Sequence, residues 1–385
     1  MTINRRYLKV EWKSSKLGFD EIESTRGRMS GTLLEETIAV RRGEDFDREA
    51  VRRYLLEHVE GVPADLPMEV RQFPSGASNL TYLIRIGDWE AVMRRPPFGP
   101  LPPKAHDMKR ESQLLMRLHP VFPLVPKPYV FCEDESVIGA PFYVMERKKG
   151  VVLDRQFPPG VAVNEAVCRQ ISYAVVDTLV QLHQVDYREA GLEEFGRPEG
   201  FLERQVRGWI GRYERVRTEE IPVVDRVSRW LLDHLPVSQG TTIVHNDFKL
   251  NNMLMSQDLS QVVAVLDWEM ATIGDPLFDL GVTLGYWVLA DDPELLKRGL
   301  PTITTTPGFI RREEFIERYA QKTGRDVSNI DYYLTFAHFK LAVVLQQIYY
   351  RWKIGKTQDE RFASFGEMVR NLMMYAAELV ERQSG

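Results

Sequence analysis

The sequence has little cysteine, no long apolar run and no excess of basic charge. Its 385 residues include two cysteines, Cys132 and Cys168, without CxxC spacing, which argues against a disulfide framework or a thiolate zinc site. No apolar run approaches the roughly 20 residues needed to span a bilayer. Charged residues such as Arg5, Lys9 and Lys13 occupy the place of a signal-peptide apolar region. These absences predict a soluble, cytoplasmic protein.

The charge balance is mildly acidic. Lysine and arginine number 50 against 55 acidic residues, a net charge of −5. This balance argues against nucleic-acid or anionic-membrane binding as the main role. We therefore expect a small-molecule partner, and the composition leaves the oligomeric state open.

Several common enzyme motifs are also missing. The sequence contains no GxGxxG, GxSxG or HExxH motif, so it gives no support for a nicotinamide-binding Rossmann domain, an α/β-hydrolase or a zinc protease. Gly355-Lys356-Thr357 resembles the end of a P-loop, but Tyr350 occupies the position of the first glycine. That segment also follows a predicted helix rather than a strand, so we reject a P-loop.

The pattern of apolar and turn-forming residues predicts two unequal parts. Residues 1–44 are polar and form an N-terminal extension, and residues 45–145 form a small β-rich lobe that begins with a helix capped by Asp47. Residues 146–385 are mainly helical, with a compact β-rich insert at 241–269 whose strands read as a hairpin. Further helices are expected at 104–118, 311–319, 332–350 and 360–382. The predicted fold class is α+β, with two lobes.

The densest chemical signal lies in the insert. Asp247 is followed five residues later by Asn252, and Asp267 comes fifteen residues after Asn252 at the end of an apolar stretch. Phosphoryl transfer needs in-line positioning and neutralisation of phosphate charge. One carboxylate can orient an acceptor hydroxyl, while an amide oxygen and a second carboxylate can hold Mg²⁺. His245 is expected to brace the loop rather than to react.

These motifs resemble a known family. His245-Asn246-Asp247-Phe248, Leu266-Asp267-Trp268-Glu269 and the segment from Gly274 to Leu280 are similar to those of the aminoglycoside phosphotransferase-like family, a branch of the protein-kinase-like fold. The resemblance covers nearly the whole chain from about residue 45. Within that family the chain resembles the kinase domains associated with acyl-CoA dehydrogenases. The resemblance implies a small β-rich N-lobe, residues 45–145, that covers the nucleotide, and a larger helical C-lobe, residues 146–385.

The resemblance also implies roles for individual residues. Asp247 would be the catalytic aspartate, Asn252 and Asp267 would be the metal ligands, and Asp279 would support the catalytic loop through its backbone. The cofactors would be ATP and Mg²⁺. One departure is Asn246, which stands where the family usually has glycine.

The nucleotide-binding residues are expected in the N-lobe and the connector. Protein kinases carry a lysine on the third strand, and this chain offers Arg94 there, with Glu111 as its carboxylate partner; Arg95 competes with Arg94 for the role. A turn with a single glycine would cover the phosphates, and the connector would offer backbone groups to adenine. The residues assigned to the turn and the connector are Ser75, Gly76, Ser78, Asn79, Glu146 and Lys148.

The predicted function is transfer of the ATP γ-phosphate to a hydroxyl of a small molecule, such as a hydroxy acid or a hydroxyacyl-CoA. The alternatives are an aminoglycoside-modifying kinase and a nucleotide-binding pseudokinase without turnover. A cationic acceptor would suit the acidic segment at 291–294. An acidic acceptor would suit the arginines of the predicted helix at 202–217, although most of them are expected on a solvated outer face beside Glu203 and Glu214.

Overall fold

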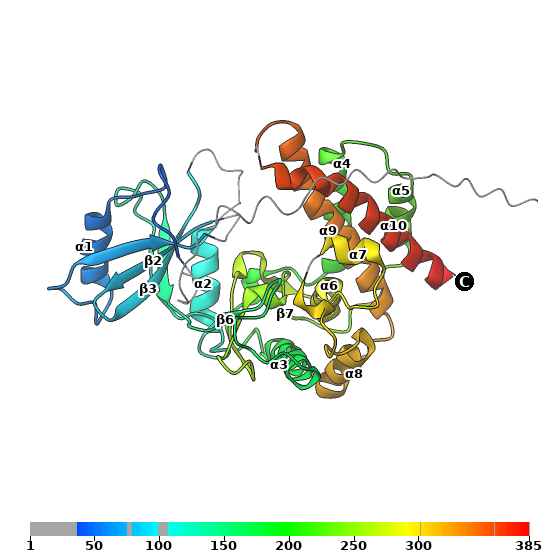
Figure 1. The fold of residues 1–385 in the computed structure, drawn as a ribbon, viewed down its shortest axis with the longest axis horizontal. Coiled ribbons are helices and arrows are strands. Elements are labelled where there is room, and N and C mark those ends of the chain that lie inside the picture. Colours follow the sequence, from blue (N-terminus) through cyan, green and yellow to red (C-terminus); the bar gives the residue numbers. More distant parts are fainter. Residues whose placement is uncertain (1–36, 75–78, 99–106, 301, 358, 385) are drawn as a thin grey trace, which may run out of the picture.

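The computed structural model describes residues 37–74, 79–98, 107–300, 302–357 and 359–384. The chain forms two lobes, a small one built around a β-sheet and a larger one that is mainly helical (Figure 1). Both parts match the predicted α+β architecture, and the two-lobed prediction is confirmed. No helix among the described residues is long and apolar enough to cross a membrane.

The small lobe is an antiparallel sheet with strand order β1-β2-β3-β5-β4. Asp47 caps its first helix by accepting a hydrogen bond of 2.9 Å from the Ala50 N–H, as predicted. Gly87, with φ of 60°, makes the tight turn between β2 and β3. The elements are α1 (Arg48–His58), β1 (Met68–Gln72), β2 (Leu80–Ile86), β3 (Trp89–Arg95), α2 (Met108–Leu118), β4 (Pro128–Cys132) and β5 (Phe142–Glu146).

The last residues of the predicted N-terminal extension lie against the small lobe. Ile38 forms an antiparallel bridge with Gln72, and the Tyr82 hydroxyl donates to the carbonyl oxygen of Glu44 at 2.5 Å. The described part of the extension therefore packs on β1 and β2 instead of standing apart from the lobe.

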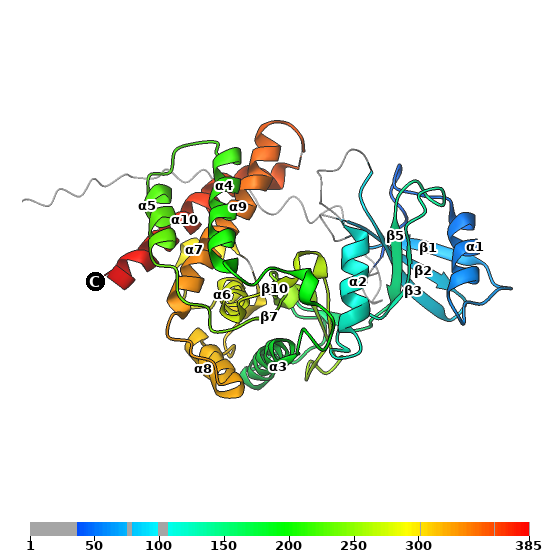
Figure 2. The same cartoon turned by 180° about the vertical axis from the view of Figure 1, so that it is seen from behind.

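The large lobe joins helices to two small antiparallel sheets (Figure 2). Its helices are α3 (Glu165–Gln184), α4 (Phe201–Val216), α5 (Val223–Asp233), α6 (Pro276–Tyr286), α7 (Glu294–Gly299), α8 (Arg312–Thr323), α9 (Ile330–Lys353) and α10 (Phe365–Ser384). Its strands are β6 (Val151–Val152), β7 (Thr242–Val244), β8 (Met253–Met255), β9 (Val262–Val265) and β10 (Thr272–Gly274).

The β-rich insert differs in part from the predicted hairpin. Strands β8 and β9 do form an antiparallel hairpin, but β7 pairs with β10 instead. The chain has a left-handed residue shortly after each of two strands, Asn246 after β7 and Asp267 after β9, so each aspartate stands in a turn at the end of a short strand. Helix α6 then follows β10 directly and anchors this region to α9. The approach of α6 and α9 is close, because a Cβ at Gly281 would lie 2.7 Å from the Cβ of Tyr333.

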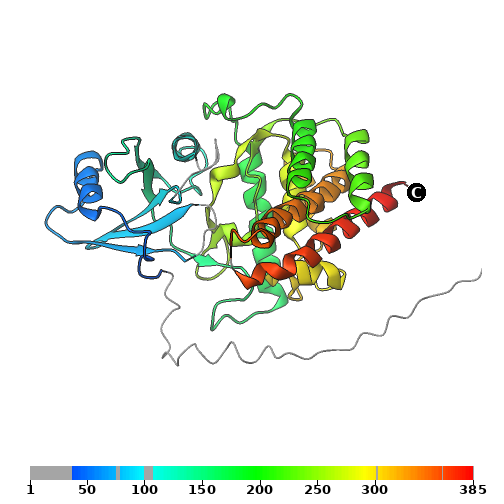
Figure 3. The same ribbon diagram turned by 90° about the horizontal axis from the view of Figure 1, so that it is seen from above.

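Each lobe has its own hydrophobic core. In the small lobe, α1 covers one face of the sheet through Val51 and Leu55. Helix α2 lies between the sheet and the large lobe (Figure 3), and its Leu114, Leu115 and Leu118 join the core of the large lobe. Helix α2 therefore couples the two lobes, and it carries Glu111 at that position.

Candidate active site

The loop at residues 245–252 leaves the end of β7 with its backbone fixed by one buried carboxylate. Asp279, in the first turn of α6, accepts hydrogen bonds from the His245 N–H at 2.7 Å and the Asn246 N–H at 2.8 Å. Burial would raise the pKa of Asp279, but His183 and His245 beside it hold that pKa below its ordinary value. An ionised Asp279 can therefore hold the loop, which is the support expected from the sequence.

Asn246 adopts the left-handed backbone conformation, with φ of 69°. Glycine favours this region and asparagine tolerates it better than most residues, so the departure from glycine leaves the turn intact. The Asn246 side chain also donates to the Met270 carbonyl oxygen at 2.8 Å. That bond ties the 245–252 loop to the segment after β9.

Asp247 lies at the centre of a small polar network. Its Oδ2 accepts hydrogen bonds from Asn252 Nδ2 and from Lys249 Nζ, both at 2.9 Å. Burial would raise the pKa of Asp247, but Lys249, Lys340 and His245 together hold that pKa below its ordinary value. Asn252 Nδ2 is bonded to Asp247 twice, through the backbone oxygen as well as the carboxylate. The Asn252 side-chain oxygen is therefore the atom that remains for a ligand.

Asp267 follows β9 and also has a left-handed backbone, with φ of 68°. Its Oδ1 lies 3.4 Å from Arg94 Nη2, and its side chain is 40% exposed. Among the described residues no group of three or more His, Cys, Asp or Glu side chains could hold a metal. Mg²⁺ does not need one, since it binds through one or two protein oxygens together with phosphates and water. The hard oxygens of Asn252 and Asp267 fit that donor set.

Arg94 connects the two lobes. Its Nη1 donates to Glu111 Oε1 at 2.5 Å, while its Nη2 faces Asp267. Burial lowers the pKa of Arg94, but Tyr143, Glu111 and Asp267 raise it above its ordinary value. Arg95 instead approaches the Pro96 and Ile138 carbonyl oxygens. The structure thus directs Arg94, rather than Arg95, toward the 267 loop.

The positions of the other residues predicted to bind the nucleotide say less about that role. Ser75, Gly76 and Ser78 lie outside the described residues. Asn79 Nδ2 donates to Glu269 Oε2 at 3.1 Å, which joins the end of the glycine turn to the large lobe. Glu146 and Lys148 form an ion pair of 3.0 Å within the connector. Their assignment to adenine binding stays a prediction.

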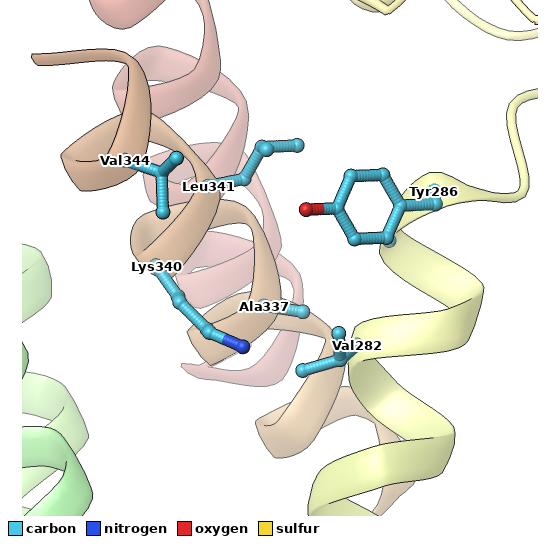
Figure 4. Close-up of a pocket in the computed structure, with 7 residues that line it drawn as sticks. Val282, Tyr286, Ala337, Lys340, Leu341 and Val344 are labelled. Carbon is cyan, nitrogen blue, oxygen red and sulfur yellow. The ribbon is translucent and has the colours of Figure 1, made fainter. Parts of the chain in front are cut away.

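Sequence reasoning missed two lysines. Lys249 lies two residues after Asp247 and could have been found by its position in the motif. Lys340, on α9, donates to the Asn246 carbonyl oxygen at 2.6 Å. Figure 4 shows Lys340 across from Tyr286, beside a void of about 10 Å³ between α6 and α9. Burial lowers the pKa of Lys340 to about 8. The only sequence signal for Lys340 was its position as a lone lysine within the apolar run of α9.

A larger pocket of about 620 Å³ opens beside the loop. Its walls come from α2, from α4, from Asn246 and from the segment 269–272. Because Asn246 directly precedes Asp247, a small molecule in this pocket would lie next to the 245–252 loop.

Comparison with known proteins places the chain among phosphotransferases. Residues 69–302 match the family model described as "Phosphotransferase enzyme family". Acyl-CoA dehydrogenase family member 10 of Mus musculus is 32% identical over 374 residues, which cover 94% of this chain and 34% of the relative. The chain spans 34 to 45% of the length of such curated relatives.

Solved structures agree with this assignment. A candidate aminoglycoside phosphotransferase from Ralstonia eutropha JMP134 is 31% identical, with a TM-score of 0.76, over 88% of this chain and 99% of that one. A thermostable mutant of aminoglycoside phosphotransferase APH(4)-Ia, in a ternary complex with ADP and hygromycin B, is 16% identical, with a TM-score of 0.52, over 84% of this chain and 98% of that one. The second likeness shows the fold alone.

Proposed function

The chain belongs to the phosphotransferase enzyme family, and we propose that it transfers the γ-phosphate of ATP to a hydroxyl of a small molecule. One observation carries this proposal. Three separate parts of the chain meet at the site: the loop with Asp247 and Asn252, the turn with Asp267, and the Arg94–Glu111 pair from the small lobe. The Leu266 N–H donates to the Asn252 carbonyl oxygen at 2.8 Å, which joins the first two parts, and Arg94 reaches Asp267. Each part offers a group that phosphoryl transfer requires.

In the proposed reaction the acceptor oxygen forms a bond to the γ-phosphorus, and the bond from that phosphorus to the β,γ-bridging oxygen breaks. ADP leaves, and the hydroxyl proton passes through Asp247 to solvent. Asp247 orients the hydroxyl, and Arg94 neutralises phosphate charge. Asn252 and Asp267 would hold Mg²⁺, which supplies charge neutralisation on the phosphates when bound. We propose that the reaction takes place in the cytoplasm, with residues 45–145 as the nucleotide-covering domain and 146–385 as the catalytic domain.

The proposed acceptor is a hydroxy acid or a hydroxyacyl-CoA. Two features support this choice over a polycationic aminoglycoside. The pocket beside the loop is lined by two guanidinium groups, Arg110 and Arg212, and by two carboxylates, Asp107 and Glu269, so it lacks the excess of acidic groups that would attract a polycation. The acidic segment expected to attract one is already neutralised in part, because Asp292 pairs with Arg312 at 2.6 Å. The curated relatives are also named for acyl-CoA dehydrogenation.

The test is ADP release with ATP, Mg²⁺ and a panel of acceptors that contains hydroxy acids, 4-hydroxyacyl-CoAs and kanamycin-type aminoglycosides. We expect turnover with the acidic acceptors and none with the aminoglycosides. Efficient phosphorylation of aminoglycosides alone would overturn the substrate class and leave the kinase reaction in place. Tight ATP binding without turnover on any acceptor would favour the pseudokinase alternative instead.

A further inference from the structure

The pocket of about 620 Å³ is lined by an arginine that has no hydrogen-bond acceptor or carboxylate partner among the described residues. Arg212, on α4, lines the pocket with Trp209, Asn246 and Glu269. Its guanidinium stacks over the Trp209 ring at 4.4 Å from the centroid. In the described part of the chain, no carboxylate, carbonyl or hydroxyl accepts a hydrogen bond from Arg212.

The other charged groups of the pocket already have partners. Arg110 Nη2 donates to the carbonyl oxygens of Phe195 at 2.9 Å and Ala271 at 2.7 Å. Asp107 caps α2 by accepting from the Arg110 N–H at 2.9 Å, and Glu269 accepts from Asn79. These bonds fix the walls of the pocket. Arg110 is thus held in place by the backbone through one of its nitrogens, whereas Arg212 donates to none of the described residues and has all of its N–H groups available to a molecule in the pocket.

The remaining arginines of α4 are placed differently. Arg204 donates to the backbone oxygens of Arg197 and Glu199, and Arg207 pairs with Glu203 at 2.8 Å on the exposed face. Arg215 is exposed and lies outside the pocket. Arg212 is partly buried, and burial together with Arg215 lowers its pKa. A desolvated guanidinium gains most from an anionic partner, because it presents a planar set of N–H donors that matches carboxylate and phosphate oxygens.

Trp209 connects this cation to the reacting loop. Its ring contacts Arg212 on the pocket side and also lies 5.5 Å from Lys340 Nζ, and Lys340 binds the Asn246 carbonyl oxygen. An anion held by Arg212 would therefore lie at a fixed place relative to Asp247. A hydroxyl elsewhere on the same molecule could then be presented to the loop.

We propose that Arg212 is a specificity-determining residue that binds an anionic group, carboxylate or phosphate, of the phosphoryl acceptor. This inference rests on the proposed kinase function, which it extends to the recognition of the acceptor. It assigns to a single side chain the preference for acidic hydroxyl compounds.

The test compares 4-hydroxypentanoate with 4-hydroxypentanamide, which differ in the anion alone, in the wild type and in Arg212→Gln. The matched control is Arg207→Gln, the same change on the exposed face of α4. We expect Arg212→Gln to lower kcat/KM for the acid about tenfold to a hundredfold, the range for a lost hydrogen bond to a charged group. The loss should appear mainly in KM, with the KM for ATP and the activity on the amide unchanged.

A third acceptor, 4-hydroxypentanoyl-CoA, separates the two sources of the anion. A defect confined to the free acid identifies a carboxylate, and a defect confined to the thioester identifies the phosphates of CoA. Either result supports the proposal. Equal activity of Arg212→Gln and wild type on all three compounds would overturn it.

Calorimetric binding of the same compounds to the intact protein separates this inference from the kinase proposal. Arg212-dependent binding of the acid without turnover would preserve the anion site and refute the kinase function. Turnover that does not depend on Arg212 would support the kinase function and refute the anion site. If neither the acid nor the thioester binds better than the amide, the anion site is wrong.

Discussion

Lys340 Nζ lies 2.6 Å from the carbonyl oxygen of Asn246 and donates a hydrogen bond to it, although 94 residues separate the two in sequence. The lysine is almost completely buried and lies over the rings of Trp209 and Phe278. A buried ammonium is costly unless it is paired. Here it neutralises part of the charge gathered around Asp247 and Asp279, and it holds the peptide that precedes Asp247.

Replacing Lys340 with methionine tests that role. The change keeps the apolar stem and removes the donor, so the Asn246 carbonyl loses a buried partner, at a cost of about 1–3 kcal/mol in the free energy of unfolding. We expect kcat to fall by roughly tenfold to a hundredfold, because small displacements of a reacting group are expensive, while the KM for ATP changes little. Steady-state kinetics and thermal unfolding measure both effects.

The control for that change is Lys353→Met, an exposed lysine near the end of the same helix. It should leave kcat unchanged. A Lys340→Met protein with full kcat would show that the 245–252 loop does not need this hydrogen bond.

Asp247→Asn should separate turnover from nucleotide binding. Asparagine keeps the shape and much of the hydrogen bonding with Asn252, but it loses the carboxylate that orients the hydroxyl and takes its proton. We expect turnover to fall by roughly two orders of magnitude or more, the range of general-base losses, with ATP affinity nearly intact. Asp258→Asn, in the exposed turn between β8 and β9, is the matched control. Survival of turnover on the true acceptor would refute the assignment of Asp247.

Asp267→Asn should act on the metal. The change removes a charged oxygen ligand, so the Mg²⁺-dependent part of ATP affinity should fall by about tenfold or more, as for lost metal-site interactions. Calorimetry of ATP binding with Mg²⁺ and with a chelator provides an internal control, since the metal-free affinity should not decrease. Unchanged affinity in the presence of Mg²⁺ would contradict the assignment of Asp267 as a ligand.

The sequence predicted those parts of the site that lie within short motifs. Asp247, Asn252 and Asp267 fall within 21 consecutive residues, and the alternation of short apolar stretches and turn residues there predicts that each aspartate stands in a loop at the end of a short strand. The two lobes were predictable for the same reason, because strand and helix patterns segregate along the chain. The position of Arg94 followed from its place on the third strand.

Arg212 and Lys340 could not be identified in this way. Their roles depend on how α4 and α9 pack against the 245–252 loop, and helix periodicity gives the buried face of a helix without naming its partner. Arg212 lies between the outward Arg207 and Arg215 on a helix rich in arginine, so sequence alone does not distinguish it. The pairing of β7 with β10 was missed because three-residue strands carry too little pattern to specify a partner.

His338 should make stability depend on pH. It is fully buried on α9, its Nδ1–H donates to the Leu334 carbonyl oxygen at 2.8 Å, and its Nε2 has no hydrogen-bond partner among the described residues. Burial lowers the pKa of His338 to about 4, helped by Arg312 and opposed by Asp292. Tyr375 covers the ring with a centroid distance of 4.8 Å. This imidazole therefore binds a proton mainly in the unfolded chain.

The sign of the pH effect follows from this difference. The unfolded chain binds a proton at His338 near pH 6.5, whereas the folded chain does so only near pH 4. The contribution of neutral His338 to the free energy of unfolding is complete above pH 6.5. It is lost as the pH falls toward 4, by about 1.4 kcal/mol per pH unit and about 3 kcal/mol in total. Urea unfolding at intervals from pH 7.5 to pH 4.5 measures this slope.

His183, whose pKa burial also lowers, adds to the slope, so the comparison with His338→Phe isolates the share of His338. The variant keeps a buried ring without a titrating group and should show a slope smaller by about one proton, whatever its absolute stability. An unchanged slope would mean that His338 is already protonated in the folded protein or reaches water there.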